Sequence, residues 1–304
     1  MSNTHSLVSN GHSTTVQPDL NIDRTSLYSV KKRPSLSLRD GTELFLRDWG
    51  SGPPILFLSG WALASDMWFY QMQPLSSEGF RCIAYDRRGH GRSSDPGYGY
   101  DYDTLSEDLH EVIETLDLRD LTIVTHSMAA GEAVRYLTRR GSSRVKRLVL
   151  LAPAGVPYAV KTDDNPTGTD AAAIKYYREN CILADFPGWC DENEKPYFAP
   201  SSPPGMTNYT KNLLLRTSLQ AVHDFHLAAT STDFRGELPG ISVPTLILHG
   251  DIDASAPLEQ YGVPTAKLIP GSRLKIYKNG PHGFYFTHKD EINSDIRSFC
   301  EEEV

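Results

Sequence analysis

Short runs of apolar, mostly β-branched or aromatic residues recur along the chain and alternate with stretches in which apolar residues keep helical spacing. The run at 55–58 is fully apolar, which is typical of a strand covered on both faces. The predicted strands cover residues 55–58, 80–85, 122–124, 145–151, 243–250 and 273–277. Helices are predicted after Thr104, after Ser127 and near the C-terminus. This rhythm predicts an α/β fold with a mostly parallel twisted sheet and helices on both faces.

Two local signals refine the ends of these elements. Residues 35–38 and 43–47 alternate apolar and polar positions around Asp40-Gly41, which predicts a β-hairpin. Thr104 is followed three residues later by Glu107, so we expect a capping box to begin the first long helix at Thr104.

The strand–helix rhythm stops between residues 154 and 238. Helical stretches are predicted around 171–180 and 209–229. The segment is rich in aromatic side chains, namely Tyr176, Tyr177, Phe186, Trp189, Tyr197 and Phe198. An insertion between two parts of one sheet predicts a lid over 154–238 on a core formed by 31–153 and 239–304. Residues 1–30 lack periodicity and predict a disordered tail.

Composition narrows the class of partner. The formal net charge is −8 and no long Lys/Arg cluster occurs, which argues against nucleic acid or an anionic membrane as a partner. No apolar run reaches the roughly 18 residues of a membrane span. The first twenty residues lack a hydrophobic block, so we expect no secretory signal and a cytoplasmic protein.

The cysteines fit a reducing compartment. Cys82 and Cys300 fall in predicted core elements, whereas a pairing of Cys181 with Cys190 stays open. Neither a cluster with metal-ligand spacing nor a glycine-rich phosphate loop occurs, so no metal or nucleotide cofactor is expected.

The stretch from Leu121 to Gly131 carries the strongest chemical signal. It places Ser127 between a buried strand and a helix, where a sharp turn would free the hydroxyl for nucleophilic attack. Such an elbow usually has glycine two residues before and after the serine, and this chain has Thr125 and Ala129.

A serine nucleophile needs a histidine base and a carboxylate that orients it. In a parallel sheet these groups gather at the carboxyl ends of strands. The strand at 243–250 is followed by Asp251 and Asp253, and the strand at 273–277 is followed by His282. The order Ser127, Asp253, His282 is one known arrangement of a catalytic triad.

With these residues in this order, the chain resembles the α/β-hydrolase superfamily over roughly residues 35 to 300. It is most similar to cofactor-free haloperoxidases, also called perhydrolases, and to related serine esterases. The motifs that carry the resemblance are Ser127-Met128 before Gly131-Glu132, His249-Gly250-Asp251-Ile252-Asp253, and Gly280-Pro281-His282-Gly283 with Thr287-His288.

The resemblance implies roles for individual residues. Asp253 takes the acid position because it lies three residues after Gly250. The backbone N–H groups of Met128 and Trp61 form the oxyanion hole, where Ser59-Gly60 precedes Trp61 instead of the usual His-Gly. Trp61 and Gly60 then line the substrate pocket.

Other residues remain alternatives. Asp251 is a second candidate acid, although we interpret it as a helix cap, and His288 is a second candidate base. His126 and His249 are interpreted as structural and His90 as a loop tie. For His223 and His226 in the lid, substrate contact and a surface role both stay open.

The expected function is hydrolysis of a small-molecule carboxylic ester or lactone through an acyl-enzyme, with perhydrolase side activity when peroxide replaces water. The alternatives are a ligand-binding protein on a hydrolase fold and a biosynthetic C–C hydrolase or cyclase using the same pocket. A homo-oligomer is compatible with the sequence.

Overall fold

The computed structural model describes residues 34–199 and 202–303, and the predicted tail at 1–30 lies outside them. Within these ranges, one eight-stranded sheet runs in the order β1-β2-β4-β3-β5-β6-β7-β8. The strands are β1 Ser35–Ser37, β2 Glu43–Trp49, β3 Pro54–Leu58, β4 Arg81–Tyr85, β5 Leu121–His126, β6 Val145–Leu151, β7 Thr245–Gly250 and β8 Arg273–Tyr277. Strands β3 to β8 pair in parallel, whereas β2 is antiparallel to β1 and β4. The predicted α/β fold and hairpin are confirmed.

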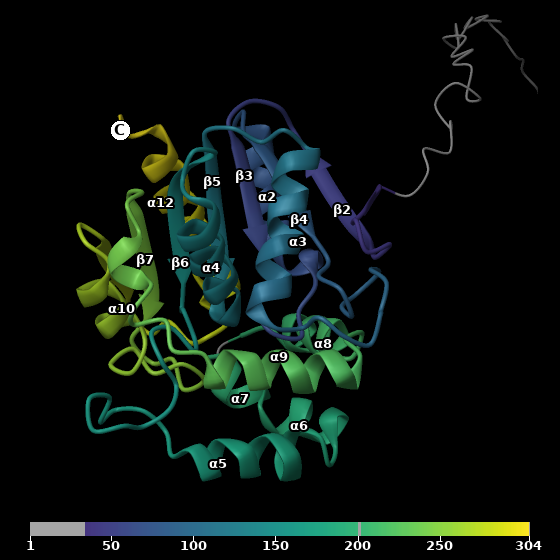
Figure 1. Ribbon diagram of the computed structural model, residues 1–304, viewed down its shortest axis with the longest axis vertical. Coiled ribbons are helices and arrows are strands. Elements are labelled where there is room, and N and C mark those ends of the chain that lie inside the picture. Colours follow the sequence, from purple (N-terminus) through teal and green to yellow (C-terminus); the bar gives the residue numbers. More distant parts are fainter. Residues whose placement is uncertain (1–33, 200–201, 304) are drawn as a thin grey trace, which may run out of the picture. The chain divides into compact units, whose positions relative to one another are not determined.

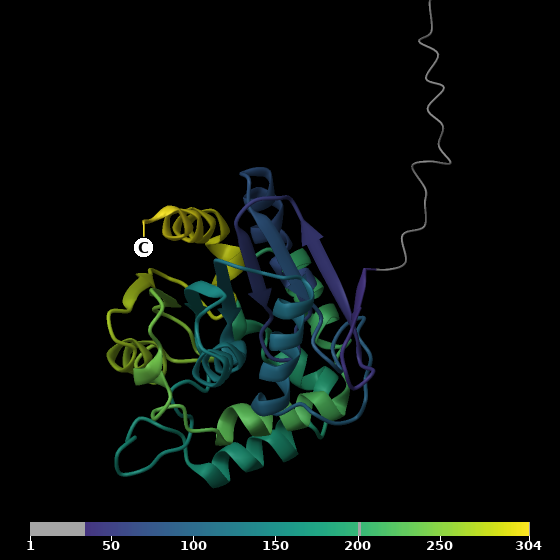
Figure 2. The ribbon, with the colours of Figure 1, turned by 45° about the horizontal axis from the view of Figure 1, so that its top comes forward.

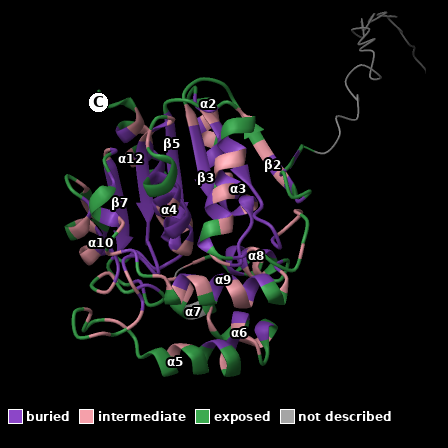
Figure 3. Ribbon diagram, viewed as in Figure 1, coloured by how far each residue is buried: buried purple, intermediate pink, exposed green. Residues whose placement is uncertain are grey.

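Helices cover both faces of the sheet (Figure 1). The helices of this layer are α2 Phe69–Ser77, α3 Tyr102–Thr115, α4 Ala130–Arg140, α10 Gly262–Leu268, α11 Phe284–Thr287 and α12 Lys289–Glu301. Alternate residues of β5 enter different cores, since Ile123 packs with α3 and α4 while Val124 packs with α2 and α12. All six residues of β5 are buried, and Figure 3 shows the central strands as the most buried part. The strand that leads to Ser127 is therefore fixed on both sides.

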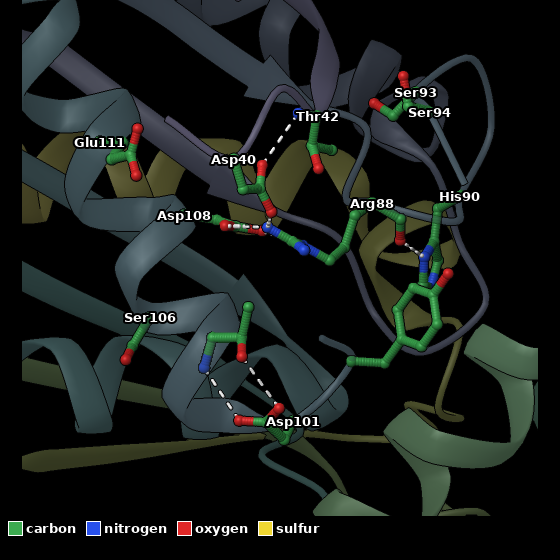
Figure 4. Close-up of polar contacts among 12 residues, drawn as sticks. Asp40, Thr42, Arg88, His90, Ser93, Ser94, Asp101, Ser106, Asp108 and Glu111 are labelled. Atoms are coloured by element: carbon green, nitrogen blue, oxygen red, sulfur yellow. Dashed lines mark hydrogen bonds and ion pairs between the residues drawn. The ribbon is translucent and has the colours of Figure 1, made fainter. Parts of the chain in front are cut away.

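Helix α3 begins three residues earlier than predicted. Its N-cap is Asp101, whose carboxylate accepts hydrogen bonds from the N–H and the hydroxyl of Thr104, both at 3.0 Å (Figure 4). The predicted N-cap at Thr104 is wrong because an aspartate three residues upstream provides the acceptor.

The segment between β6 and β7 is helical and lies at the carboxyl end of the parallel strands in both views (Figure 1 and Figure 2). It contains α5 Ala171–Tyr176, a π-helix Tyr177–Ile182, α6 Phe186–Glu192, α7 Glu194–Tyr197, α8 Pro204–Leu214 and α9 Leu219–Ser231. The single helix predicted around 209–229 is wrong. Helix α8 ends at Leu214, and a new helix, α9, begins after Ser218, whose side chain accepts a hydrogen bond from the Ala221 N–H.

All four cysteines carry free thiols, so Cys181 and Cys190 are not paired. In the described ranges, no helix combines the length and the apolar character needed to cross a bilayer. Nor do these residues include a group of three or more His, Cys, Asp or Glu side chains suited to a metal ion.

Candidate active site

Ser127 occupies a strained turn between β5 and α4. Its φ is +57°, a left-handed conformation that costs an L-residue about 1–2 kcal/mol. The preceding His126 is still extended, so the chain reverses sharply at the serine. Small residues make this possible, since a Cβ on Gly131 would lie 2.4 Å from the Tyr102 ring. The turn presents the Ser127 hydroxyl to a cavity at the end of the sheet.

Ser127, His282 and Asp253 form a continuous chain of hydrogen bonds. The Ser127 hydroxyl lies 2.9 Å from His282 Nε2, and His282 Nδ1 lies 2.7 Å from Asp253 Oδ2. Because a carboxylate only accepts, Nδ1 carries the hydrogen and Nε2 is left to accept the serine proton. The other carboxylate oxygen, Oδ1, accepts from the Ala256 N–H at 2.7 Å.

The loops after β7 and β8 are bound to each other, which brings Asp253 beside His282. The N–H of Asp251 donates to the Tyr277 carbonyl at 3.1 Å, and that of Ile252 donates to the Gly280 carbonyl at 3.2 Å. A Cβ on Gly250 would lie 1.9 Å from the Gly280 carbonyl oxygen. This approach explains why both loops contain glycine.

The alternative acid and base lie elsewhere. Asp251 is exposed and caps no helix, since α10 begins only at Gly262, so its interpretation as a cap is wrong. His288 is half-buried at the start of α12, and its Nε2 donates to the Lys278 carbonyl at 3.1 Å.

Two buried histidines beside Ser127 and His282 donate hydrogen bonds to backbone carbonyls. His126 Nε2 donates to the His282 carbonyl at 3.1 Å, and His249 Nε2 donates to the Ala256 carbonyl at 2.8 Å. Burial lowers the pKa of both imidazoles, which favours their neutral forms. His90 lies against the Arg88 carbonyl at 2.8 Å (Figure 4).

The two lid histidines differ. His226 lines the cavity, with its ring centroid 5.6 Å from that of Trp61, and burial lowers its pKa to about 3. His223 is half-buried and contacts the neighbouring Asp224. Only the first of them is in a position to meet a ligand in the cavity.

The segment Ser59–Ala62 passes close to the elbow. A Cβ on Gly60 would lie 2.6 Å from His126 Nδ1, so glycine permits this approach. Among the described residues, the Trp61 N–H has no backbone acceptor, and Met128 is the second residue of the 3-10 turn Ser127–Ala129, where an N–H has no partner within the turn. Both residues and Gly60 line the cavity. Two free donors beside a serine hydroxyl are what an oxyanion hole requires.

The segment between β6 and β7 is hydrogen-bonded to the same loop. The Trp61 indole donates to the Val222 carbonyl at 2.9 Å, and the Thr217 hydroxyl donates to the Ala62 carbonyl at 2.9 Å. Helix α9 and its N-terminal connection are thus part of the wall around the site.

The cavity has a volume of about 480 Å³ and a mainly apolar wall. Of the aromatic residues noted in the lid sequence, Tyr177, Trp189, Tyr197 and Phe198 line it. Phe186 stacks on Trp189 at 5.9 Å, and Tyr176 is exposed. No motif or spacing in the sequence pointed to the polar lining residues Asn193, Thr210 and Lys211.

Thr125 differs from the usual elbow glycine and offers a stability test. It is fully buried between β3 and β6, and no described residue hydrogen-bonds its hydroxyl. Thr125→Val is therefore expected to raise the free energy of unfolding by about 1 kcal/mol in urea titrations, because it removes an unpaired buried hydroxyl. Thr125→Gly should lower stability but retain activity. Loss of activity in the folded glycine variant would show that the threonine has a specific task.

Comparisons with known proteins agree with this geometry. A family model described as alpha/beta hydrolase fold matches residues 53–289. A non-heme haloperoxidase of Rhodococcus erythropolis is 37% identical over 273 residues, which cover 88% of this chain and 99% of that protein. A bifunctional esterase/perhydrolase of Acinetobacter calcoaceticus is 34% identical, with 87% and 98% covered.

A solved structure extends the comparison to three dimensions. The esterase from Exiguobacterium antarcticum superposes with a TM-score of 0.85 at 31% identity, covering 89% of this chain and 100% of that one. The resemblance first seen in the motifs is confirmed by fold and by sequence: the chain belongs to the alpha/beta hydrolase family and is related to its haloperoxidase, perhydrolase and esterase members.

Proposed function

We propose that the protein hydrolyses carboxylic esters or lactones of small molecules through an acyl-enzyme on Ser127. The observation that carries this proposal is the hydrogen-bonded chain from Asp253 through His282 to the Ser127 hydroxyl. A serine hydroxyl becomes a competent nucleophile when an oriented imidazole takes its proton during attack. Names of relatives support the same class of reaction.

The first half-reaction forms the acyl-enzyme. Ser127 Oγ bonds to the ester carbonyl carbon while its proton moves to His282 Nε2, and Asp253 stabilises the resulting imidazolium. The carbonyl oxygen becomes an oxyanion that the N–H groups of Trp61 and Met128 stabilise, each worth about 3–4 kcal/mol of barrier. Collapse breaks the bond to the alcohol, which takes the proton from His282.

The second half-reaction releases the acid. Water gives a proton to His282 Nε2 as its oxygen bonds to the acyl carbon, and Ser127 Oγ leaves with that proton. If hydrogen peroxide replaces water, the product is a peracid, which oxidises halide without a cofactor. The relative described as esterase/perhydrolase favours this as a second activity.

The cavity supports a substrate of modest size with an apolar acyl or alcohol group. A volume of about 480 Å³, walled by Trp61, Trp189 and Phe198, would exclude long branched lipids and accept aryl or short alkyl groups. We also propose that segment 154–238 acts as the lid that makes this selection.

A substrate screen tests the proposal. p-Nitrophenyl esters of increasing acyl length and simple lactones are expected to show turnover that peaks at short to medium acyl chains. Peracid formation from acetate and hydrogen peroxide is measured alongside. The absence of turnover with every ester and lactone would instead favour a ligand-binding protein or a C–C hydrolase on the same fold.

A further inference from the structure

Two consecutive arginines after β4 make different buried ion pairs. Arg88 binds Asp108 in α3, with two contacts of 2.7 Å, and the hairpin residue Asp40 at 3.0 Å (Figure 4). Arg87 instead lies 2.5 Å from Glu132, in the first turn of α4, and its Nη2 donates to the Ser59 carbonyl at 2.7 Å. The second pair therefore joins the helix after the candidate nucleophile to the segment that leads into Trp61.

The Arg87–Glu132 pair is costly to bury. The two side chains are only 3% and 0% exposed. Burial raises the pKa of the Glu132 carboxyl to about 7, which reflects the difficulty of keeping it charged there. Buried pairs add little net stability relative to apolar residues of similar size. Stability alone therefore does not account for this pair.

The directed bond of Arg87 goes to one backbone atom. Nε and Nη1 of Arg87 have no acceptor among the described residues. The well-directed hydrogen bond of this guanidinium is therefore the one from Nη2 to the Ser59 carbonyl. The guanidinium also stacks over the Phe225 ring of α9, with Cζ 4.8 Å from the ring centroid. These contacts leave it little freedom to move.

The Ser59 carbonyl belongs to a segment that needs restraint. Gly60, the next residue, lacks a Cβ and is conformationally permissive. The Gly60 carbonyl accepts from the Leu63 N–H at 3.1 Å, and the Ala62 carbonyl accepts from Thr217 at 2.9 Å. Arg87 supplies the restraint on the upstream side of the Trp61 N–H.

The Met128 N–H, the second proposed donor, lies close in sequence to Glu132. Met128 lies in the 3-10 turn Ser127–Ala129 just before α4, four residues before Glu132, and its carbonyl accepts from the Tyr102 hydroxyl at 2.7 Å. Moving Arg87 relative to Glu132 would change the separation between the Trp61 and Met128 N–H groups.

We propose that Arg87, held by Glu132, is a positioning residue that sets the distance between the two oxyanion donors on Trp61 and Met128. The proposal rests on the proposed hydrolase function. It assigns the pair a task in the transition state that an apolar pair of the same size would not perform.

The test replaces the whole pair, so that no buried charge is left alone. The double variant R87M/E132L is expected to keep the wild-type thermal midpoint or exceed it. Its kcat for the best p-nitrophenyl ester should fall by about 10–100-fold, since small misplacements of catalytic groups have effects of this size. KM should change less than threefold. The inhibition constant of a trifluoromethyl ketone, whose adduct mimics the oxyanion, should rise by the same factor as kcat falls.

The matched control is R88M/D108L, which removes the neighbouring buried pair and spares Ser59. It is expected to keep kcat and the ketone inhibition constant within threefold of wild type. R87K keeps a donor and should give an intermediate loss of kcat, which provides a readout if the double variant fails to fold. Wild-type kcat in folded R87M/E132L or in R87K, or an equal loss in the control, would overturn the proposal. Failure of the wild-type protein to turn over any ester would instead overturn the proposed function itself.

Discussion

Replacing Ser127 with alanine is expected to lower kcat for an ester by about 10⁶-fold, because the acyl-enzyme route then has no nucleophile. His282 and the donors on Trp61 and Met128 would remain, so a residual rate of about 10³-fold over the uncatalysed reaction is expected. The substitution removes only the hydroxyl oxygen, and the backbone of the turn already has its unusual φ of +57°. Stability should therefore change little, and the rate is measured against a standard ester at saturating concentration.

The control for this variant is Ser255→Ala, since Ser255 also lines the cavity. It lies outside the hydrogen-bonded chain and should retain activity. A fluorophosphonate probe should label wild type and S255A but not S127A. Labelling of folded S127A, or near-normal turnover by it, would show that another residue is the nucleophile.

Asp253→Asn is expected to lower kcat by about 10⁴-fold by imposing the wrong tautomer on His282. The Ala256 N–H donates to Asp253 Oδ1, so an asparagine would keep its oxygen at that position. Its NH₂ group would then face His282 Nδ1 and donate to it. Nε2 would carry the hydrogen and could no longer accept the Ser127 proton.

The matched control is Asp251→Asn, two residues away in the same loop. Asp251 is exposed, so this variant should keep kcat within twofold. Equal losses in the two variants would indicate disruption of the loop rather than loss of the acid.

The strands with regular apolar patterns could be predicted from the sequence because both of their faces are buried. The fully apolar runs 55–58 and 148–151 lie in the central strands β3 and β6, since a parallel sheet covered on both faces leaves no polar side. The start of α3 was missed because Asp101 and Thr104 are both good caps and only their geometry decides between them. The break between α8 and α9 was missed because helical spacing continues through residues 215–218.

Some residues of the candidate site could be predicted from the sequence and others could not. Ser127, Asp253 and His282 could be named because each follows a recognisable strand, and parallel strands bring their carboxyl ends together. That Asn193 and Thr210 line the cavity could not be predicted, since their positions depend on how the irregular helices between β6 and β7 fold back over it. Glu132 belongs to a motif that carries the family resemblance, but its partner could not be predicted. Only the structure shows that Arg87 and Glu132 are buried as a pair and that Arg87 donates to the Ser59 carbonyl.

Trapping the acyl-enzyme tests the nucleophilic role of Ser127 most directly. Wild-type protein is mixed with p-nitrophenyl acetate, quenched in acid within milliseconds and digested for peptide mass spectrometry. We expect a burst of p-nitrophenol close to one equivalent per active site, with an acetyl group on Ser127. An acetyl group on another residue, or steady turnover during which Ser127 is never acetylated, would contradict that role.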